Sequence, residues 1–368
     1  MVLQENTPSL NETGKASIKV VGVGGGGVNA VRRMSVIEIP GLELLCLNTD
    51  ASSLTFSYGI PSIVMGTEAT KGLGAGGNPE VGRLAAEESR DAIAAELEGA
   101  DLVFVAAGMG GGTGTGAAPL VAQVAAEIGA VSVAVVTTPF KFEGPRRNSS
   151  ARDGLMPLKA AADTVIVVSN DRLLSNVERT TSVRDSFGLA DQVMVDAITS
   201  LSRIINVAGD VNVDFADIRA VVSGGGLGLM AMGSGDGEGR VIAALKDACD
   251  KPLLTAKPHG AGSMIYFVNG GPDLTMKEIQ EAGRFAASVG DPDAEIFFGM
   301  HMDPKKLSGE PVEVILIATH LPESALPDPQ HLSVEERVKL ATEKYHEAGP
   351  EPELPNFLQD LDLRMDPQ

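Results

Sequence analysis

Two glycine-rich segments constrain the fold of this chain more than any other feature of its sequence. The first, VGGGGVN at residues 23–29, follows the β-branched run Ile18–Val23, and a helical pattern begins at Asn29. The second, GMGGGTGTG at residues 108–116, follows the apolar run 101–107 and precedes a helical pattern over 117–128. Glycine lets the backbone approach a ligand closely, and a helix N-terminus presents free N–H groups to an anion. Both segments therefore predict a phosphate site at the end of a strand.

The same alternation of strand, polar turn and helix continues along the first half of the chain. Three more apolar runs end in polar residues: 42–47 before Asn48, 131–136 before Thr137, and 164–168 before Ser169. Apolar strands that alternate with helices are typical of a parallel sheet with helices on both faces. We predict a doubly wound α/β sheet whose ligand lies at the carboxyl ends of its strands.

The second half of the chain has a different pattern. A helical pattern over residues 183–206 is long enough to link two domains, and mixed α and β elements follow it. The first of these is the segment 213–223, and a glycine-rich stretch at 224–239 follows it. The others are expected helices at 241–249 and 276–288, and expected strands at 263–268, 295–301 and 312–318.

The C-terminal segment from residue 322 to 368 has the composition of a disordered tail. It contains eleven acidic and four basic side chains, and six prolines lie between residues 322 and 355. Such a segment has too few apolar side chains to bury a core. One helix at 333–347 is the only element that its pattern allows.

Charge and composition exclude several classes of protein. The net charge of −20 disfavours nucleic acid as a partner, because an acidic surface repels a polyanion. No apolar run reaches the roughly 18 residues that a membrane helix needs, and the N-terminus lacks the pattern of a secretory signal. We expect a soluble, cytoplasmic protein without direct membrane insertion. Cys46 and Cys249 lie in apolar surroundings, which favours reduced thiols.

The glycine segments leave more than one ligand open. Gly22, Gly24 and Gly27 satisfy the G-x-G-x-x-G pattern of dinucleotide-binding proteins, so an NAD(P)-dependent oxidoreductase is one alternative. An oxidoreductase of that class does not need GMGGGTGTG. It also needs an acidic residue about 20 positions after the glycines to bind the ribose of the dinucleotide, and Asp50 lies later than that. The sequence lacks the G-x-x-x-x-G-K-[ST] motif, which excludes a Walker A phosphate-binding loop. Two glycine segments at neighbouring strand ends favour one polyphosphate, although tight packing alone is a further alternative.

Several motifs, in the same order along the chain, resemble those of the tubulin/FtsZ family of GTPases, in the bacterial FtsZ form. The resemblance spans residues 19–318. It rests on GMGGGTGTGAAP, VGGGGVN, the NTD at 48–50, KGLGAGGNPEVG at 71–82, PFKFEGPRR at 139–147, residues 170–174 and NVDFADIR at 212–219.

The resemblance implies a set of GTP-binding residues. Glu143 and Arg147 would contact the ribose and a nearby phosphate, and Phe187 would stack on guanine. Asn170 and Asp191 would accept hydrogen bonds from the guanine edge, which adenine cannot donate. The phosphates would lie on Gly25, Gly26, Gly27, Asn29, Gly110, Gly111, Gly112, Thr113, Gly114 and Thr115. The remaining implied positions are Asn48, Asp50, Gly76 and Thr138.

Each base-site residue also has a plain structural alternative. Asn170 could cap a turn, Phe187 could belong to the core, and Asp191 could be a solvated helix residue. GMGGGTGTG contains no lysine, so backbone N–H groups and a Mg²⁺ ion would offset the phosphate charge. No protein ligand for that ion is assigned.

The resemblance implies that Asn212, Asp214 and Asp217 are catalytic. In the family this segment enters the nucleotide site of the next subunit, where it would position the attacking water. From the residues alone, Asp214 and Asp217 are better explained as the N-terminal cap of a helix. A shared site of this kind requires head-to-tail homopolymer filaments. A scaffold that polymerises but barely hydrolyses GTP is the second alternative, which the presence of both acids disfavours.

The resemblance also implies a domain organisation. It comprises a disordered segment 1–16, a GTP-binding domain 17–182, a central linking helix 183–208, a smaller α+β domain 209–321 with the catalytic loop, and the acidic tail 322–368. The tail carries ELPNFL, from Glu353 to Leu358, which resembles the peptide that docks on membrane-anchoring and regulatory division proteins. The implied role is a scaffold of the cell-division ring, concentrated at mid-cell. Gln192, the run Gly224, Gly225 and Gly226, and His320 depart from the family pattern.

Overall fold

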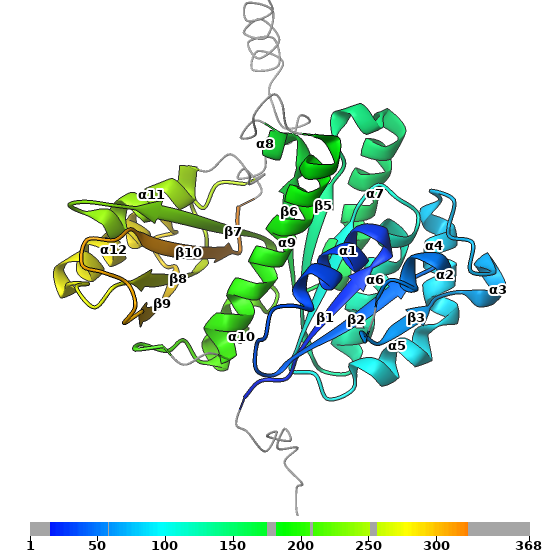
Figure 1. The fold of residues 1–368 in the computed structure, drawn as a ribbon, viewed down its shortest axis with the longest axis horizontal. Coiled ribbons are helices and arrows are strands. Elements are labelled where there is room, and N and C mark those ends of the chain that lie inside the picture. The colour runs from blue at the N-terminus through cyan, green and yellow to red at the C-terminus, as the bar shows by residue number, and fades with distance from the viewer. Residues whose placement is uncertain (1–14, 58, 175–181, 207–208, 251–255, 323–368) are drawn as a thin grey trace, which may run out of the picture. The chain divides into compact units, whose positions relative to one another are not determined.

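A computed structural model describes residues 15–57, 59–174, 182–206, 209–250 and 256–322 (Figure 1). The expected tail helix at 333–347 and the docking peptide ELPNFL lie outside these residues, as does most of the expected N-terminal segment 1–16.

The first half of the chain forms the parallel sheet that the sequence predicts. Its strands follow the order β3-β2-β1-β4-β5-β6, and every neighbouring pair is parallel. They are β1 (Ile18–Val23), β2 (Leu42–Asn48), β3 (Ser62–Val64), β4 (Leu102–Gly108), β5 (Val131–Thr138) and β6 (Thr164–Ser169). Because all of these strands point the same way, the loops after β1, β4, β5 and β6 meet at one edge.

The sheet continues without a break into the second half of the chain. Strand β7 (Gly226–Gly235) pairs in parallel with β6 and antiparallel with β10 (Val312–Thr319). Beyond β10 lie β8 (Ser263–Gly270) and β9 (Glu295–Met302), which are parallel to each other. The result is one sheet of ten strands with a parallel and a mixed part.

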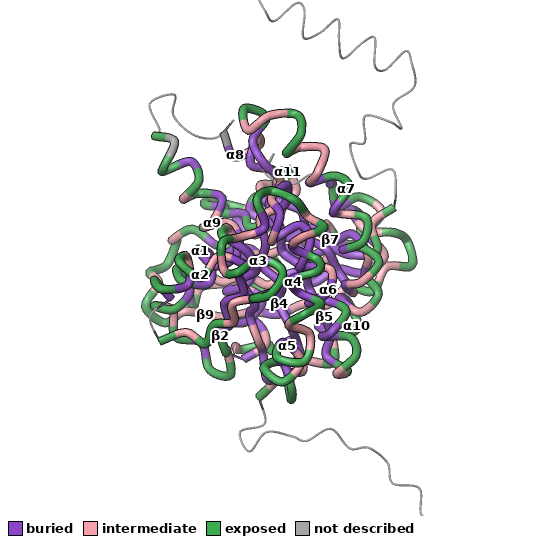
Figure 2. The backbone as a smooth tube through the Cα atoms, turned by 90° about the vertical axis from the view of Figure 1, so that its right-hand side faces the viewer, coloured by how far each residue is buried: buried purple, intermediate pink, exposed green. Residues whose placement is uncertain are grey.

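Helices cover both faces of the sheet, and the pleat decides which side chains each face buries. In β1, Val21 and Val23 pack against the layer of α4, α5 and α6, whereas Ile18 and Val20 pack against α1, α9 and α10. Figure 2 shows the buried backbone in the interior and the exposed backbone on the outer turns and helices. The helices are α1 (Gly24–Met34), α2 (Ala51–Leu54), α3 (Thr67–Thr70), α4 (Pro79–Glu88), α5 (Arg90–Leu97), α6 (Thr113–Glu127), α7 (Pro145–Ala161), α8 (Asn170–Leu174), α9 (Val183–Asn206), α10 (Phe215–Val222), α11 (Arg240–Asp250) and α12 (Met276–Val289).

Helix α9 has the bounds that the sequence predicts and runs the length of the parallel sheet (Figure 1). Near its start, Phe187 contacts Phe140, which follows β5. At its end, the Asn206 amide donates to the carbonyls of Ala16 and Pro40, which precede β1 and β2. At 1.5 Å per residue its 24 residues span roughly 36 Å, so the helix connects the two opposite edges of the sheet.

The expected starts of two helices in the glycine-rich segments are wrong. Helix α1 begins at Gly24 rather than Asn29, and α6 begins at Thr113 rather than at residue 117, so glycine forms part of both first turns. The stretch 224–239 contains strand β7. A Cβ atom on Gly233 would lie 1.9 Å from the carbonyl oxygen of Ala244, so glycine is needed there because α11 packs directly on the strand.

No helix in the described part of the chain is both long and apolar enough to cross a membrane. Cys46 is buried and Cys249 is half-buried, and both are free thiols, as the sequence predicts.

Candidate nucleotide site

Two helix N-termini lie side by side at the carboxyl edge of the parallel sheet, after the neighbouring strands β1 and β4. Neither α1 nor α6 has an acidic residue in its first turn, and no side chain among the described residues caps either helix. A Cβ on Gly24 would lie 2.9 Å from the nitrogen of Gly114, which shows how closely the two turns approach. Helix α4, by contrast, is capped by Asn78, which accepts from the Glu80 N–H at 3.1 Å. The bare N–H groups of α1 and α6, with the helix dipoles, form a site for an anion.

The glycines of this site serve two separate purposes. Gly27 and Gly114 allow close packing, because a Cβ at either position would lie 2.0 Å from the Ala106 oxygen or 2.4 Å from the Gly108 oxygen. For Gly25 and Gly111, the described part of the chain places no atom within 4 Å of such a Cβ. The open space beside these two glycines is where a ligand can reach the backbone. Of the other implied glycines, Gly76 is open, whereas Gly26, Gly110 and Gly112 have neighbours at 3.3, 2.6 and 2.7 Å.

The two threonines of GMGGGTGTG differ in their surroundings. The Thr115 hydroxyl is buried and accepts from the Gly110 N–H at 2.8 Å, so it stabilises the loop from within. The Thr113 hydroxyl is half-buried and lies 2.6 Å from the hydroxyl of Thr49, at the end of β2. Thr113 is therefore better placed than Thr115 to donate to a phosphate.

Asn48 and Asp50 shape the end of β2. Asn48 is buried, its amide lies 2.5 Å from the Ser53 hydroxyl, and its oxygen accepts from the Thr49 N–H at 2.9 Å. Asp50 caps α2, and the hydroxyl and N–H of Ser52 lower the pKa of its carboxyl group. Both side chains are thus engaged within the protein.

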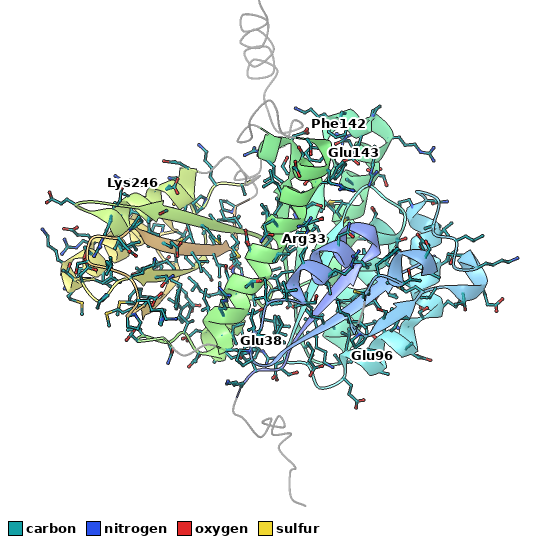
Figure 3. The ribbon with its side chains drawn as sticks, viewed as in Figure 1. Arg33, Glu38, Glu96, Phe142, Glu143 and Lys246 are labelled. Atoms are coloured by element: carbon teal, nitrogen blue, oxygen red, sulfur yellow. The ribbon has the colours of Figure 1, made fainter. Side chains whose placement is uncertain are left out.

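Glu143 and Arg147 come from the segment between β5 and α7. The Glu143 carboxylate accepts from the Phe140 N–H at 2.8 Å and forms an ion pair with Arg147 at 3.0 Å. Glu143 is nearly buried, whereas about half of the Arg147 side chain is exposed. Figure 3 shows Phe142 and Glu143 near α8, at one edge of the parallel sheet, and Glu38 and Glu96 at the opposite edge of the same sheet. Thr138, the last residue of β5, lies at the same edge as Glu143.

At the expected base site, the structure brings together residues from α8 and α9. Asn170 is 5% exposed, and its side-chain oxygen accepts no hydrogen bond from any residue in the described part of the chain. An unpaired buried acceptor is costly, so this atom fits a ligand that donates. Phe187 packs edge-to-face on Phe140, with ring centres 5.1 Å apart, yet remains 39% exposed. Its exposed part is available to an aromatic ring.

Asp191 lies one turn beyond Phe187 and pairs with Arg33 of α1 at 3.4 Å. Burial raises the pKa of Asp191 to about 6, against the opposing effect of Arg33. Asp191, Asn29 and Arg33 line one cavity of about 690 Å³. Gln192, beside Asp191, instead donates to Asp196 at 2.8 Å.

The segment implied to be catalytic lies at the other edge of the sheet. Asp214 caps α10 by accepting from the Asp217 N–H at 2.9 Å, and Asn212 accepts from the Gly209 N–H at 2.6 Å. Within one chain, the structure does not bring these residues to the glycine segments. The helix-cap interpretation of Asp214 is correct, and a catalytic role would have to be additional.

Sequence reasoning missed Arg33. The signal for it was its spacing of four residues from Asn29, which places both on one face of α1. Sequence alone could not show which residue of α9 that face would meet. In the described ranges, no cluster of three or more His, Cys, Asp or Glu side chains could bind a metal ion.

The parallel sheet and its paired, uncapped helix N-termini are typical of an α/β nucleotide-binding protein. Residues 17–178 match the model of the tubulin/FtsZ family GTPase domain, and residues 226–322 match that of the FtsZ family C-terminal domain. The chain belongs to the tubulin/FtsZ family.

Solved structures agree with this assignment. A dimeric FtsZ from M. jannaschii is 40% identical, with a TM-score of 0.77, over 84% of this chain and 89% of that one. CetZ1 of Haloferax volcanii, a GDP-bound monomer, shares the fold at 20% identity and a TM-score of 0.74, over 89% of this chain and 100% of that one. The protein is therefore a GTPase that binds GTP and GDP and hydrolyses GTP, and the oxidoreductase alternative is set aside.

Proposed function

We propose that this GTPase assembles head to tail and hydrolyses GTP at the contact between subunits. The observation that carries the proposal is the separation of the two halves of the expected active site. Helix α9 starts beside Phe140 and ends beside Ala16, and the segment with Asp214 follows its far end. A helix of roughly 36 Å thus separates Asp214 from the glycine segments of its own chain. A second copy brings the two halves together.

In each subunit, the carboxyl edge of the sheet would bind the nucleotide. The N–H groups of the first turns of α1 and α6 bind the phosphates, and the open positions Gly25 and Gly111 admit them. Asn170 and the ionised Asp191 accept from the N1–H and N2–H₂ groups of guanine, while Phe187 contacts its face. Glu143 and Arg147 bind the ribose side. The other GTP-binding positions implied by the family resemblance belong to the same proposal.

The neighbouring subunit would supply the groups that act on water. Asp214 and Asp217 are exposed or half-exposed at the start of α10, and Asn212 lies just before them. Their carboxylates and amide orient the attacking water in line with the γ-phosphate. A Mg²⁺ ion on the phosphates would offset the charge that develops there. No acid of this chain is assigned to the ion.

The biological role proposed is that of a polymerising scaffold of the cell-division ring. The dimer formed by the M. jannaschii relative supports self-association. A GTP-binding domain 17–182 and a second domain 209–321, joined by the linking helix 183–208, belong to the same proposal. Docking of membrane-anchoring and regulatory division proteins on ELPNFL, and concentration in the cytoplasm at mid-cell, complete the proposal.

Protein concentration tests the shared site. Phosphate release per subunit should rise steeply as assembly begins, because each site needs two copies. Light scattering after addition of GTP, GDP or a slowly hydrolysed analogue, with Mg²⁺ present, reports the assembly itself. A rate per subunit that is independent of protein concentration would exclude the shared site.

A further inference from the structure

Two of the three departures from the family pattern, Gly224–Gly226 and His320, meet at one place in the structure. The N–H of His320 donates to the carbonyl of Gly225 at 2.9 Å. His320 has a φ of 52°, and Gly224 and Gly226 have φ values of 61° and 63°. The positive φ of His320 needs a structural reason, since non-glycine residues seldom adopt this conformation.

The place where they meet is the C-terminal end of α10. A helix leaves its last carbonyls without partners inside the helix. Here the hydroxyl of Thr164 donates to the Val222 carbonyl at 2.6 Å, and the hydroxyl of Thr319 donates to the Val221 carbonyl at 2.6 Å. Both threonines are completely buried. We call these two threonines and two carbonyls the threonine clasp.

The clasp connects three separate segments. Thr164 is the first residue of β6 in the parallel sheet, and Thr319 is the last residue of β10 in the mixed part. Gly225 lies close to both threonines. A Cβ atom on Gly225 would lie 2.5 Å from the Thr164 hydroxyl and 3.0 Å from the Thr319 Cβ. Glycine is therefore required for both hydroxyls to reach the end of α10.

The clasp fixes the short helix that carries the proposed catalytic acids. Helix α10 has eight residues, and Asp214 caps its other end. Its buried side chains, Ile218, Val221 and Val222, pack in the core beneath it. A rigid helix of about 12 Å converts a small tilt at its C-terminus into a displacement of Asp214. Because catalytic groups must be placed accurately, such a displacement lowers the rate without affecting nucleotide affinity.

From this geometry, and resting on the function proposed above, we infer that Thr164 and Thr319 are positioning residues for GTP hydrolysis. They orient α10, and with it the acids that this subunit presents to the nucleotide of its neighbour. Strand β6 begins at Thr164 and ends beside Asn170, so the clasp also ties α10 to the strand that leads to the base site of the same subunit.

Thr319→Val tests this inference because valine keeps the shape of threonine and removes its hydroxyl group. The loss of a donor from a buried carbonyl should lower kcat about fivefold to tenfold, with KM for GTP unchanged. Thr319→Ser, which restores the hydroxyl, should recover most of the rate. The matched control is Thr199→Val, since Thr199 is also buried but its hydroxyl has no hydrogen-bond partner among the residues that the structure describes. A kcat for Thr319→Val equal to that of the control would overturn the inference.

Mixed assemblies separate the proposed role from a general loss of stability. Gly111→Glu places a carboxylate in the open phosphate site, and Asp214→Ala removes a proposed catalytic acid. When the two variants are mixed, activity should come from GTP on the Asp214→Ala subunit and α10 of the Gly111→Glu subunit. Thr319→Val should lower this activity when added to the Gly111→Glu chain, and leave it unchanged when added to the Asp214→Ala chain.

The outcomes of this experiment are distinct. If the two parent variants show no activity in the mixture, the shared site fails and the proposed function with it. If the parents complement each other but Thr319→Val acts equally from either chain, the proposed function stands and the positioning role is wrong. The asymmetric result supports both.

Discussion

The first N–H groups of a helix have no partner inside the helix. Helices α1 and α6 differ from α10 in how these groups are treated. In the described part of the chain, no side chain caps the N-terminus of α1 or α6, and glycine keeps the approach to both open. At α10 the Asp214 side chain accepts a hydrogen bond from a first-turn N–H, and two threonine hydroxyls donate to carbonyls at the C-terminal end. A bare terminus is complete only with a ligand, whereas a capped terminus is already stable. The difference separates a region that can accept a ligand from a region whose N–H groups already have a side-chain partner.

Asp214 offers the strongest test of this contrast, because its capping and proposed catalytic functions can be separated. We expect Asp214→Ala to bind GTP normally and to lose turnover by about a thousandfold, the scale of a charged group acting on phosphoryl transfer. Asp217→Ala should behave similarly. Phosphate release above the assembly concentration measures the loss.

Asp214→Asn is the matched control for the helix cap. Asparagine caps a helix as well as aspartate does, so only the alanine variant should lose about 1 kcal/mol of unfolding free energy. Both variants should be inactive if the charge is catalytic. Normal turnover in Asp214→Asn would show that capping is the sole function of this side chain.

Gly27 and Gly25 test the two purposes of glycine at the bare termini. Gly27→Ala should lower the free energy of unfolding by about 3 kcal/mol, because its Cβ would clash with the Ala106 oxygen. Gly25→Ala has free space and should weaken GTP binding with little change in stability. Urea denaturation and nucleotide titration distinguish them. Equal losses of stability would contradict the division.

The pH dependence of GTP binding tests Asp191. Its pKa of about 6 lies above the usual value, so the carboxylate is mostly ionised at pH 7 and mostly protonated at pH 5. GTP affinity should therefore fall roughly tenfold between pH 7 and pH 5, as the acceptor for guanine is lost. For stability the sign is opposite: because the folded state takes up the proton more readily, this group's contribution declines as pH rises from about 4 to 6.

Asp191→Asn is the control for that titration. It should remove this component of the pH dependence of GTP affinity, because the amide does not ionise. An unchanged pH profile in the variant would assign the effect to another group.

Thr115 gives the smallest expected effect. Thr115→Val leaves the buried N–H of Gly110 without its acceptor and should cost about 1 kcal/mol of unfolding free energy. GTP binding should change less than in a Thr113→Val variant, because only Thr113 is half-exposed. Thermal unfolding and nucleotide titration provide the comparison.

Sequence patterns predicted most of the framework because the determining interactions are local or periodic. The strands after which the glycine segments lie and helix α9 agree with their patterns, since burial on both faces produces continuous apolar runs. Strand β7 was missed because its glycines resemble a loop, and only the packing of α11 explains them.

Some features of the candidate site could likewise be predicted from the sequence, whereas others depended on the tertiary structure. The sequence by itself predicted a glycine-lined phosphate site, because clustered glycines at the junction of a strand and a helix let a ligand approach the backbone. Only the tertiary structure decided which glycines face open space, that Arg33 pairs with Asp191, and that two threonines from distant strands close the end of α10. These facts depend on residues far apart in the chain, and no local pattern specifies which distant atoms will meet.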